Sequence, residues 1–354
     1  MKLKLLYSSL ICVITSLTFG LSSCDNPIYV ASKDETMTEH NNIWFGAYWY
    51  PWYGKDGWHW EEGYLGEPVL GEYDSSAREV INQQANWAKD SGLSFFVASW
   101  WGIDTYEDRV IKDAIHEYST DSDFKYAILY ESTGLLDLQN GWIELSNSNN
   151  QAKFLSDFKY LAEKYFPLPG YLRINERPVV FIYLTRIFTG DIAKVMGEVR
   201  SAIIDSTGEN PYLIGDEVYW HSPVASRISP YDGVTAYNMH TSVPGIAVNF
   251  PSKVEAVYSE WKKITDDIGV AFIPDVLPGF DDTAVRPEAN HPIIERTPDQ
   301  FKEQLISAVK LASGEQRMVV VTSWNEWHEY TSIEPSQEFG QNYLDILKFF
   351  TFNH

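Results

Sequence analysis

Short runs of β-branched and aromatic residues alternate with longer amphipathic stretches along most of the chain. Eight such runs follow residue 42, and each has a length typical of a buried strand. They occupy residues 43–50, 93–101, 124–131, 178–185, 211–217, 233–238, 270–276 and 318–324. Stretches with helical spacing of apolar residues lie between or after them, at 76–91, 105–119, 146–165, 190–206, 250–266, 299–313 and 338–349. Only the fifth and sixth runs are joined by a connection too short for a full helix.

The long connections decide how the predicted strands pair. Parallel strands need crossovers of about a dozen or more residues, and the helical stretches supply them. Runs such as FFVAS at 95–99 and VVFIY at 179–183 are apolar on both faces, as a sheet covered by helices requires. Eight strand–helix repeats are typical of a closed (β/α)8 barrel, the TIM barrel of the α/β class, rather than of an open sheet. We expect one barrel domain over residues 42–354, without a second domain.

The first 23 residues differ in composition from the rest. They contain two lysines, an apolar run and small residues before Cys24, which together are typical of an export signal. The run is too short and too often interrupted by serine and threonine to span a membrane. Residues 21–24, Leu-Ser-Ser-Cys, resemble the bacterial lipobox, in which the chain is cleaved before the cysteine and the cysteine is acylated. An ordinary signal peptide with a coincidental cysteine is the alternative.

The lipobox interpretation assigns residues 1–23 to a lipoprotein signal peptide and residues 24–41 to a polar, lipid-anchored tether. The protein would then be held at a bacterial cell membrane, at the outer-membrane surface or the periplasmic face. Cys12 and Cys24 are the only two cysteines. Cleavage removes the first and acylation uses the second, so no disulfide is available and the hydrophobic core must stabilise the fold.

The net charge and the aromatic content of the chain indicate which kinds of molecule it binds. A net charge of −22 repels phosphate backbones and anionic lipid headgroups, which disfavours nucleic acid and acidic membrane surfaces as partners. Eight of the 13 tryptophans lie between Trp44 and Trp101, a density that core packing seldom requires. Flat apolar side chains of this kind suit the rings of sugars. We expect a monomer that binds an oligo- or polysaccharide and contacts a membrane only through its lipid.

Polar and aromatic residues follow the carboxyl ends of the predicted strands, where barrel enzymes build their active sites. The candidates for contact with a substrate are Tyr50, His59, Trp60, Trp100, Trp101, Glu131, Asp216, Tyr237, Asn238, Asp275, His328 and Tyr330. Other roles remain open for several of them. Trp100 and Trp101 alternate in direction along a strand, so at most one of them stacks on sugar. Asp216 and Asp275 could bind sugar hydroxyls or pair with nearby arginines.

The segment Asn-Glu-Trp-His-Glu at 325–329 holds two carboxylates directly after the last predicted strand. In a turn or a first helical turn, residues three apart are neighbours with Cβ atoms roughly 5 to 6 Å apart. Carboxyl groups about 5 to 5.5 Å apart suit a retaining glycosidase, whereas inverting enzymes separate theirs by roughly 6.5 to 9.5 Å. The spacing of Glu326 and Glu329 therefore favours retention. A solvated helix face is the other interpretation of such a pair.

Several segments together resemble glycoside hydrolase family 99 and family-99-like proteins, the endo-α-mannosidases and endo-α-1,2-mannanases. They are Tyr-Pro-Trp-Tyr at 50–53, Ser-Trp-Trp-Gly at 99–102, Trp-Asn-Glu-Trp-His-Glu at 324–329 and Ile-Glu-Pro at 333–335. The resemblance covers the chain from Trp44 onward. It implies a metal-independent (β/α)8 glycosidase, without a cofactor, that cleaves α-linked glycans with retention. Endo-action on α-mannan or a related polysaccharide is one activity that it implies.

The same resemblance implies separate roles for the two acids. Glu326 matches the residue that removes the proton from the sugar 2-hydroxyl, so that this oxygen attacks C1 and forms a 1,2-anhydro sugar. Glu329 matches the general acid for the leaving oxygen, which then acts as the base for water. Tyr330 stands where the mannan-cleaving relatives tend to have a small residue, and 99–102 departs from their Trp-Tyr-Pro pattern. The sugar and the linkage are therefore not predicted.

Two further functions remain open from the residues alone. A glycan-binding lipoprotein on an inactive barrel would explain the aromatic residues but has no use for two adjacent acids. A metal-dependent hydrolase would use His59, His240 and His328 together with the acids. Neither an HxH nor an HExxH spacing occurs, which weighs against the metal-dependent alternative.

Overall fold

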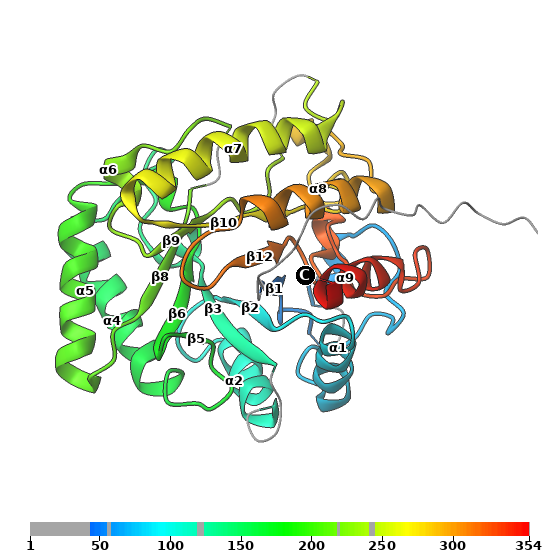
Figure 1. Cartoon of the computed structure of the whole chain (residues 1–354). Coiled ribbons are helices and arrows are strands. Elements are labelled where there is room, and N and C mark those ends of the chain that lie inside the picture. Colours follow the sequence, from blue (N-terminus) through cyan, green and yellow to red (C-terminus); the bar gives the residue numbers. More distant parts are fainter. Residues whose placement is uncertain (1–42, 55–57, 119–123, 218–219, 241–244, 354) are drawn as a thin grey trace, which may run out of the picture. The chain divides into compact units, whose positions relative to one another are not determined.

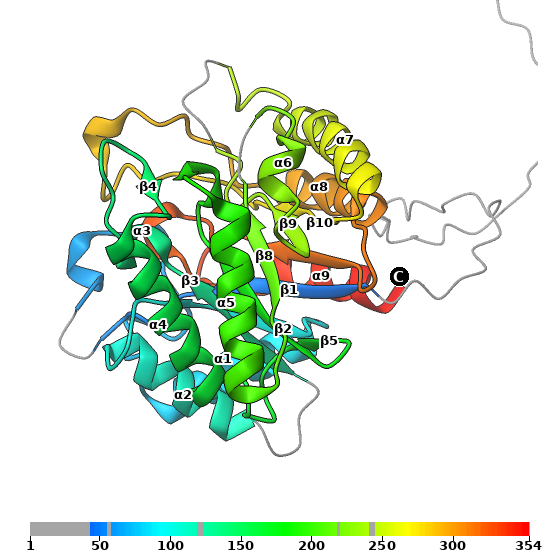
Figure 2. The ribbon, with the colours of Figure 1, turned by 90° about the vertical axis from the view of Figure 1, so that its left-hand side faces the viewer.

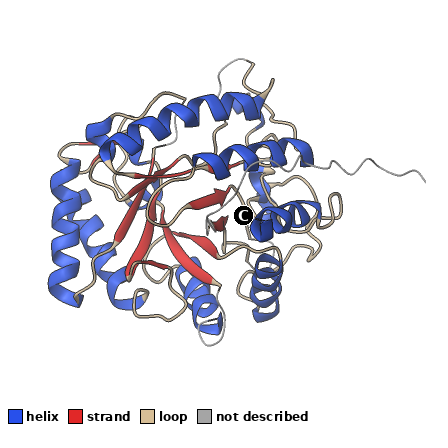
Figure 3. Ribbon diagram, viewed as in Figure 1, coloured by secondary structure: helices blue, strands red, loops and turns tan. Residues whose placement is uncertain are grey.

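The computed structural model describes residues 43–54, 58–118, 124–217, 220–240 and 245–353. The predicted signal peptide, the tether and Cys24 lie outside these residues. Within the compact unit Asn41–His354, a parallel sheet lies at the centre and helices surround it (Figure 1, Figure 3). None of the helices in the described part of the chain is both long and apolar enough to cross a lipid bilayer.

Every predicted strand is present in the central sheet. The strands are β1 (Trp44–Trp49), β2 (Phe95–Trp100), β3 (Lys125–Tyr130), β6 (Arg177–Ile182), β8 (Tyr212–Asp216), β9 (Gly233–Thr235), β10 (Ala271–Ile273), β11 (Asp275–Val276) and β12 (Met318–Val321). Their order in the sheet is β10-β9-β8-β6-β3-β2-β1-β12-β11, and each of these neighbouring pairs is parallel.

β10 and β11 are two halves of the predicted seventh strand, and Pro274 separates them. Proline has no N–H to donate to a ladder, so it interrupts the strand. The carbonyl of Pro274 still accepts a hydrogen bond from the Val320 N–H at 3.0 Å. The first half pairs with β9 and the second with β12. This strand closes the sheet on itself, which confirms the predicted (β/α)8 barrel.

Helices connect the strands and cover the outside of the barrel (Figure 1, Figure 2). The longer ones are α1 (Arg78–Asp90), α2 (Tyr106–Tyr118), α4 (Ser148–Lys164), α5 (Ile192–Thr207), α7 (Phe250–Ile268), α8 (Pro298–Leu311) and α9 (Asn342–Asn353). The short elements are α3 (Ser132–Leu135), α6 (Ala225–Ile228), β4 (Ile143–Glu144), β5 (Arg173–Ile174), β7 (Phe188–Thr189) and the 3-10 turns η2 (Trp60–Glu62), η3 (Thr185–Ile187), η4 (Pro287–Ala289) and η5 (Trp327–Glu329). As expected, the described residues of the connection from β8 to β9 hold no helix longer than the single-turn α6.

Side-chain caps fix where several of these helices begin. Asn147, Asp191 and Thr297 each accept a hydrogen bond from a backbone N–H in the first turn of α4, α5 and α8. Such a cap satisfies one of the N–H groups that a helix start leaves without a partner and contributes about 1 kcal/mol. These caps therefore define the first residues of α4, α5 and α8.

Alternation along each strand divides the core into two layers. In β2, Phe96 and Ala98 point outward and pack with the helices, whereas Phe95 and Val97 point into the barrel. The inner layer includes Phe181 and apolar residues of the other strands, all buried. Truncating a buried ring such as Phe181 to alanine typically costs about 3 to 5 kcal/mol. The barrel interior is thus a packed core that fixes the strand ends above it.

Candidate active site

The chain leaves β12 in a tight path that presents both candidate acids from one turn. Glu326 precedes η5, and its carboxylate accepts a hydrogen bond from the backbone N–H of His328 at 3.0 Å. Glu329 is the last residue of the same turn. The backbone N–H of Glu326 donates to the Ser323 hydroxyl at 2.7 Å. Both carboxylates are therefore held by a short, internally bonded segment rather than by an open loop.

Asn325 joins this segment to the end of β1. Its side-chain oxygen accepts from the Tyr50 N–H at 2.7 Å, and its side-chain nitrogen donates to the Tyr50 carbonyl at 2.9 Å. The same nitrogen donates to the hydroxyl of Tyr73 at 3.0 Å. A reciprocal pair of this kind replaces the backbone ladder where the two strands end. Tyr50 is therefore fixed beside the Glu326 turn.

Burial and mutual repulsion set the protonation of the two acids. Burial raises the pKa of the Glu326 carboxyl well above its usual value, and the negative charge of Glu329 raises it further. Burial also raises the pKa of Glu329, although Arg286 opposes this rise. Each carboxylate disfavours ionisation of the other, so the pair tends to keep one proton. One proton on two acids is the state that combined acid and base catalysis needs.

Glu329 is oriented by two donors from other parts of the rim. Asn238, which follows β9, donates its side-chain N–H to Glu329 at 2.8 Å. Arg286, in the long loop after β11, donates to the other carboxylate oxygen at 3.0 Å and also pairs with Asp282 at 2.8 Å. These contacts leave Glu329 little freedom to rotate. The loop after β11 therefore contributes to the site although it lies far along the chain.

Two tyrosines lie across the mouth of the barrel from β1 to β9. The hydroxyls of Tyr50 and Tyr237 are 2.5 Å apart, and both side chains are buried. Burial raises the pKa of each well above its usual value, and the charges of Glu326 and Glu329 add to this effect. Both hydroxyls therefore stay protonated and can act as donors. The structure brings these two predicted residues together with the acid pair.

Glu131 and Trp101 extend the site toward β2 and β3. Burial raises the pKa of Glu131 to about 8. Its carboxyl accepts a hydrogen bond from the Ser99 hydroxyl at 2.6 Å, and the indole N–H of Trp101 donates to the same hydroxyl at 2.8 Å. Trp101 is half-buried and lies 6.0 Å from Trp52 between ring centroids. The two tryptophans supply aromatic surface next to a carboxyl group.

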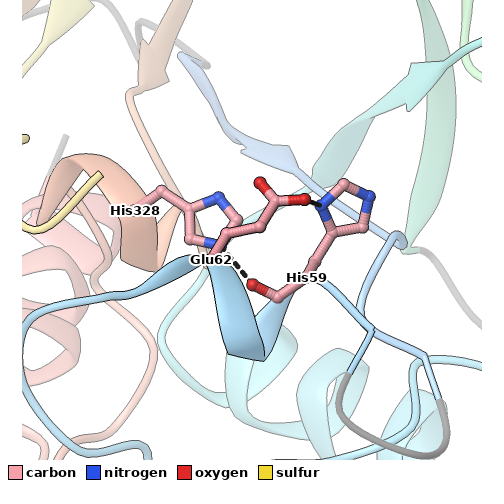
Figure 4. Close-up of side chains that lie close together, drawn as sticks. All are labelled: His59, Glu62 and His328. Atoms are coloured by element: carbon pink, nitrogen blue, oxygen red, sulfur yellow. Dashed lines mark hydrogen bonds and ion pairs between the residues drawn. The ribbon is translucent and has the colours of Figure 1, made fainter. Parts of the chain in front are cut away.

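His59 and His328 lie close together, with Glu62 beside them (Figure 4). His328 places Nε2 2.8 Å from the His59 carbonyl and Nδ1 3.6 Å from the Glu326 carboxylate. The His59 Nδ1 atom is 3.0 Å from Glu62. One candidate ligand atom from each of His59, Glu62 and His328 falls within 4.8 Å of the others, so within the described ranges this group could hold a metal ion. His240 is not part of it and stacks on Phe280 at 3.8 Å.

Comparison with known proteins places this site in a family. The family model described as "Glycosyltransferase WbsX" matches residues 37–347, most of the chain. The chain belongs to this family.

Several proteins similar to this chain carry names of glycosidases. The human glycoprotein endo-alpha-1,2-mannosidase-like protein is 24% identical to this WbsX-family chain over 318 residues, which cover 79% of this chain and 60% of the relative. The chain thus spans about three fifths of that relative. The predicted resemblance to family 99 and its relatives is confirmed.

Solved structures confirm the fold of this WbsX-family barrel. A glycoside hydrolase-like protein superposes with a TM-score of 0.77 at 21% identity and covers 90% of this chain and 97% of its own. The family 99 endo-alpha-mannosidase from Bacteroides thetaiotaomicron superposes with a TM-score of 0.66 at 18% identity and covers 87% of this chain and 96% of its own.

Two of the predicted sugar contacts, Trp100 and Trp60, have buried rings that structural partners hold in place. Trp100 is fully buried between the sheet and the helices, and its indole N–H donates to Asp108 of α2 at 2.8 Å. Trp60 stacks on Tyr53 at 3.9 Å between centroids, and its N–H donates to the Tyr73 carbonyl at 2.8 Å. Trp100 therefore points toward the helices, and Trp101, the next residue along the chain, is the half-buried ring of the two.

Three further predicted contacts have structural partners. Asp216 accepts hydrogen bonds from the backbone N–H groups of Leu184 at 3.1 Å and Tyr237 at 3.0 Å, which ties β8 to its neighbours. Asp275 is buried in the barrel and accepts from the Thr322 hydroxyl at 2.7 Å. Tyr330 bonds to Glu338 and packs on the Arg296 guanidinium at 4.5 Å. Each of the three therefore has a structural partner, and its contact with sugar stays a prediction.

Two residues that contact the candidate site, Arg286 and Trp52, were not among the predicted substrate contacts. Arg286 lies in a loop without periodicity, and only the fold brings it to Glu329. Trp52 was visible inside the Tyr-Pro-Trp-Tyr segment and now proves to lie against Tyr50, His59 and His328, at 4.6, 5.2 and 5.8 Å between centroids. The position of Trp52 between two tyrosines, directly after the first strand, was the signal in the sequence that could have indicated this role.

Proposed function

We propose that this chain is a retaining glycoside hydrolase of α-linked glycans, with Glu326 and Glu329 as its catalytic pair. One observation carries the proposal: a single bonded turn holds both carboxylates, buried and mutually repelling, beside the paired hydroxyls of Tyr50 and Tyr237. The named similarity to endo-alpha-1,2-mannosidases supports the choice of reaction. For the same reason we propose α-mannosides as the substrate class and internal bonds as the point of cleavage.

The proposed reaction proceeds through the substrate's own 2-hydroxyl. Glu326 accepts the proton of that hydroxyl while O2 attacks C1, and the bond from C1 to the leaving oxygen breaks as Glu329 gives that oxygen a proton. The product of this step is a 1,2-anhydro sugar. Glu329 then accepts a proton from water as the water oxygen attacks C1, the bond from C1 to O2 breaks, and Glu326 returns its proton to O2. Two inversions at C1 give net retention of configuration.

The side chains around the acid pair orient it or contact the sugar in this mechanism. Asn238 and Arg286 orient the Glu329 carboxyl group. Arg286 also favours the charged form of Glu329, which opposes its first role as acid and assists its second role as base. Trp101 and Trp52 offer ring surface for sugar, while Glu131 and the tyrosine hydroxyls offer polar contacts.

The family description names a glycosyltransferase, but the side chains around the acid pair suit hydrolysis of a glycan better than transfer from a sugar nucleotide. A nucleotide donor brings a diphosphate, which anionic side chains repel. The charges of Glu131 and Glu329 raise the pKa of both Glu326 and Tyr183, so this part of the rim disfavours additional negative charge. A neutral glycan meets no such repulsion.

A metal-dependent hydrolase is a second candidate because His59, Glu62 and His328 lie together. The proposed pair reaction uses no metal, so a chelator should leave its rate unchanged. A loss of activity on chelation that zinc restores would instead favour the metal-dependent reaction.

Incubation of the purified protein with α-mannan and α-manno-oligosaccharides tests the function. We expect new reducing ends whose first-formed anomer, followed by NMR, retains the α configuration. Absence of cleavage across the α-mannosides would contradict the proposed substrate class, and an inverted anomer would contradict the mechanism.

A further inference from the structure

A cavity opens at the rim of the barrel beside the ends of β6 and β8 rather than β12. Its volume is about 350 Å³, within the range of roughly 300 to 1,000 Å³ that small-molecule pockets occupy. Its walls come from four stretches of chain, which contribute Trp142, Arg186, Ile187, Glu217, His221, Ser222, Pro223, Val224 and Arg227. None of these residues belongs to the candidate active site described above.

The small sheet formed by β4 and β7 holds the aromatic wall of this pocket in place. Ile143 pairs with Phe188 in register, so the residues just before them, Trp142 and Ile187, lie side by side. Trp142 leaves 53% of its surface exposed, a large apolar ring that folding does not bury. An exposed tryptophan fixed beside a cavity offers a flat surface to a ligand.

The polar wall combines an acceptor and a donor that are both held in place. Glu217 follows β8, is only 5% exposed, and accepts a hydrogen bond from the Thr185 hydroxyl at 3.0 Å. Arg227 of α6 lies 3.6 Å from the same carboxylate and donates to the carbonyls of Phe188 and Thr185 at 3.0 and 2.9 Å. Loop and helix therefore present a fixed carboxylate–guanidinium pair.

This combination matches a neutral sugar ring better than a charged ligand. Neighbouring sugar hydroxyls both donate and accept, so one can donate to Glu217 while the next accepts from Arg227. The carboxylate of Glu217 repels an anionic group, and Arg227 repels a cationic one. The apolar wall of Trp142, Pro223 and Val224 suits the C–H face of a pyranose.

The pocket lies across the barrel mouth from the acid pair. In the closed sheet, β1, β2 and β3 separate β12 from β6 on one side, and β9 and the β10/β11 strand separate β12 from β8 on the other. The connection after β6 links the two sites. Tyr183 meets Tyr237 of the candidate active site edge-on at 5.5 Å between centroids, and Arg186, three residues later, lines the pocket.

We propose that this pocket is an outer subsite for one neutral pyranose unit of a glycan that crosses the barrel mouth from the acid pair. The inference rests on the proposed function, since it assumes that the glycan reacts at Glu326 and Glu329. It adds that productive binding needs a chain several sugars long. Recognition of a unit remote from the cleaved bond favours long chains over disaccharides.

The test compares the variant Trp142→Ala with the control variant Leu138→Ala. Leu138 is an exposed residue of the same loop that does not line the pocket. α-Manno-oligosaccharides of two to six units serve as probes, in hydrolysis assays and, on the Glu326→Gln background, in calorimetric titrations. We expect Trp142→Ala to lower affinity and kcat/KM about 10-fold more for the longest probes than for the shortest. Leu138→Ala should keep the dependence on chain length of the parent.

The possible outcomes test the pocket proposal and the proposed function separately. The pocket proposal is overturned if affinity rises with chain length equally in Trp142→Ala and the parent, or if no probe binds. The proposed function fails separately, if the wild-type protein hydrolyses no α-mannoside while the probes still bind through Trp142. Glu217→Gln, which keeps the shape of the side chain, repeats the comparison if Trp142→Ala proves unstable in thermal unfolding.

Discussion

Asn325 shows how one amide side chain can assemble a site from distant parts of a chain. It bonds to both backbone groups of Tyr50 and to the Tyr73 hydroxyl, all in the buried part of the rim. The Tyr50 backbone groups have no neighbouring strand at this point. Asn325 therefore acts as a structural bridge between the first and last strands of the barrel and carries the two acids with it.

Replacing Asn325 by alanine should destabilise the protein and lower its activity. Each buried group of Tyr50 left without a partner costs about 1 to 3 kcal/mol. Equilibrium denaturation should report a loss of that size, with a fall in kcat from displacement of the acid pair. Asn149→Ala, at an exposed position of α4, should stay within about 0.5 kcal/mol of wild type. If the two variants were equally stable, Asn325 could not be the residue that holds the two strand ends together.

Residue patterns indicated part of the site and could not indicate the rest. The acid pair, Tyr50 and Trp101 stand at strand ends, where the barrel itself brings side chains together. Arg286 comes from a long loop whose path depends on tertiary contacts, so no local pattern could place it. Trp100 was predicted as a possible sugar contact, and the buried Asp108 that accepts its N–H was not visible in the sequence.

At the scale of elements, hydrophobic periodicity was sufficient for the strands and helices. Eight apolar runs with helical stretches between them are enough to predict the barrel, because each helical crossover makes the next strand run parallel to the one before it. The short elements were not predicted, because β4 and β7 hold only two residues each and gain their pairing from the fold. The break at Pro274 could have been predicted, since proline cannot donate within a central strand.

Gly46 of β1 gives a test of packing inside the barrel. A Cβ atom at Gly46 would lie 2.3 Å from the Phe95 ring, far inside contact distance, so Gly46→Ala forces the core to shift. We expect destabilisation of about 1 to 3 kcal/mol, measured by denaturant titration. The matched change Gly197→Ala in α5 meets no atom within 4 Å and should stabilise by about 0.5 to 1 kcal/mol. A neutral Gly46→Ala would contradict the strand register.

At the scale of the molecule, we propose that lipid on Cys24 anchors the barrel to a membrane through the tether at 24–41. Wild-type protein produced in a bacterial host should enter the detergent phase with the membrane fraction. Cys24→Ala should be released into the aqueous phase and, because the barrel begins after the tether, should keep its hydrolytic rate. Equal partitioning of both forms would refute the lipobox interpretation.

The central claim assigns different work to Glu326 and Glu329, and leaving-group dependence separates the two roles. Glu329→Gln removes a proton donor, which should cost a factor of about 10² to 10⁴ on an α-manno-oligosaccharide. An α-mannosyl fluoride needs little protonation, so it should recover much of that rate in Glu329→Gln. Glu326→Gln should stay inactive on both substrates, because no base remains to activate the 2-hydroxyl. Glu303→Gln, on the exposed face of α8, should match wild type.

The most direct measurement is therefore the rate of each of these variants on the fluoride and on the oligosaccharide, together with a 2-deoxy fluoride for the wild type. Rescue confined to Glu329→Gln, with an inert 2-deoxy substrate, is the result that we predict. Rescue of Glu326→Gln instead would reverse the two roles. Turnover of the 2-deoxy substrate through an ester trapped on Glu326 would replace the anhydro-sugar route with the ordinary two-carboxylate mechanism.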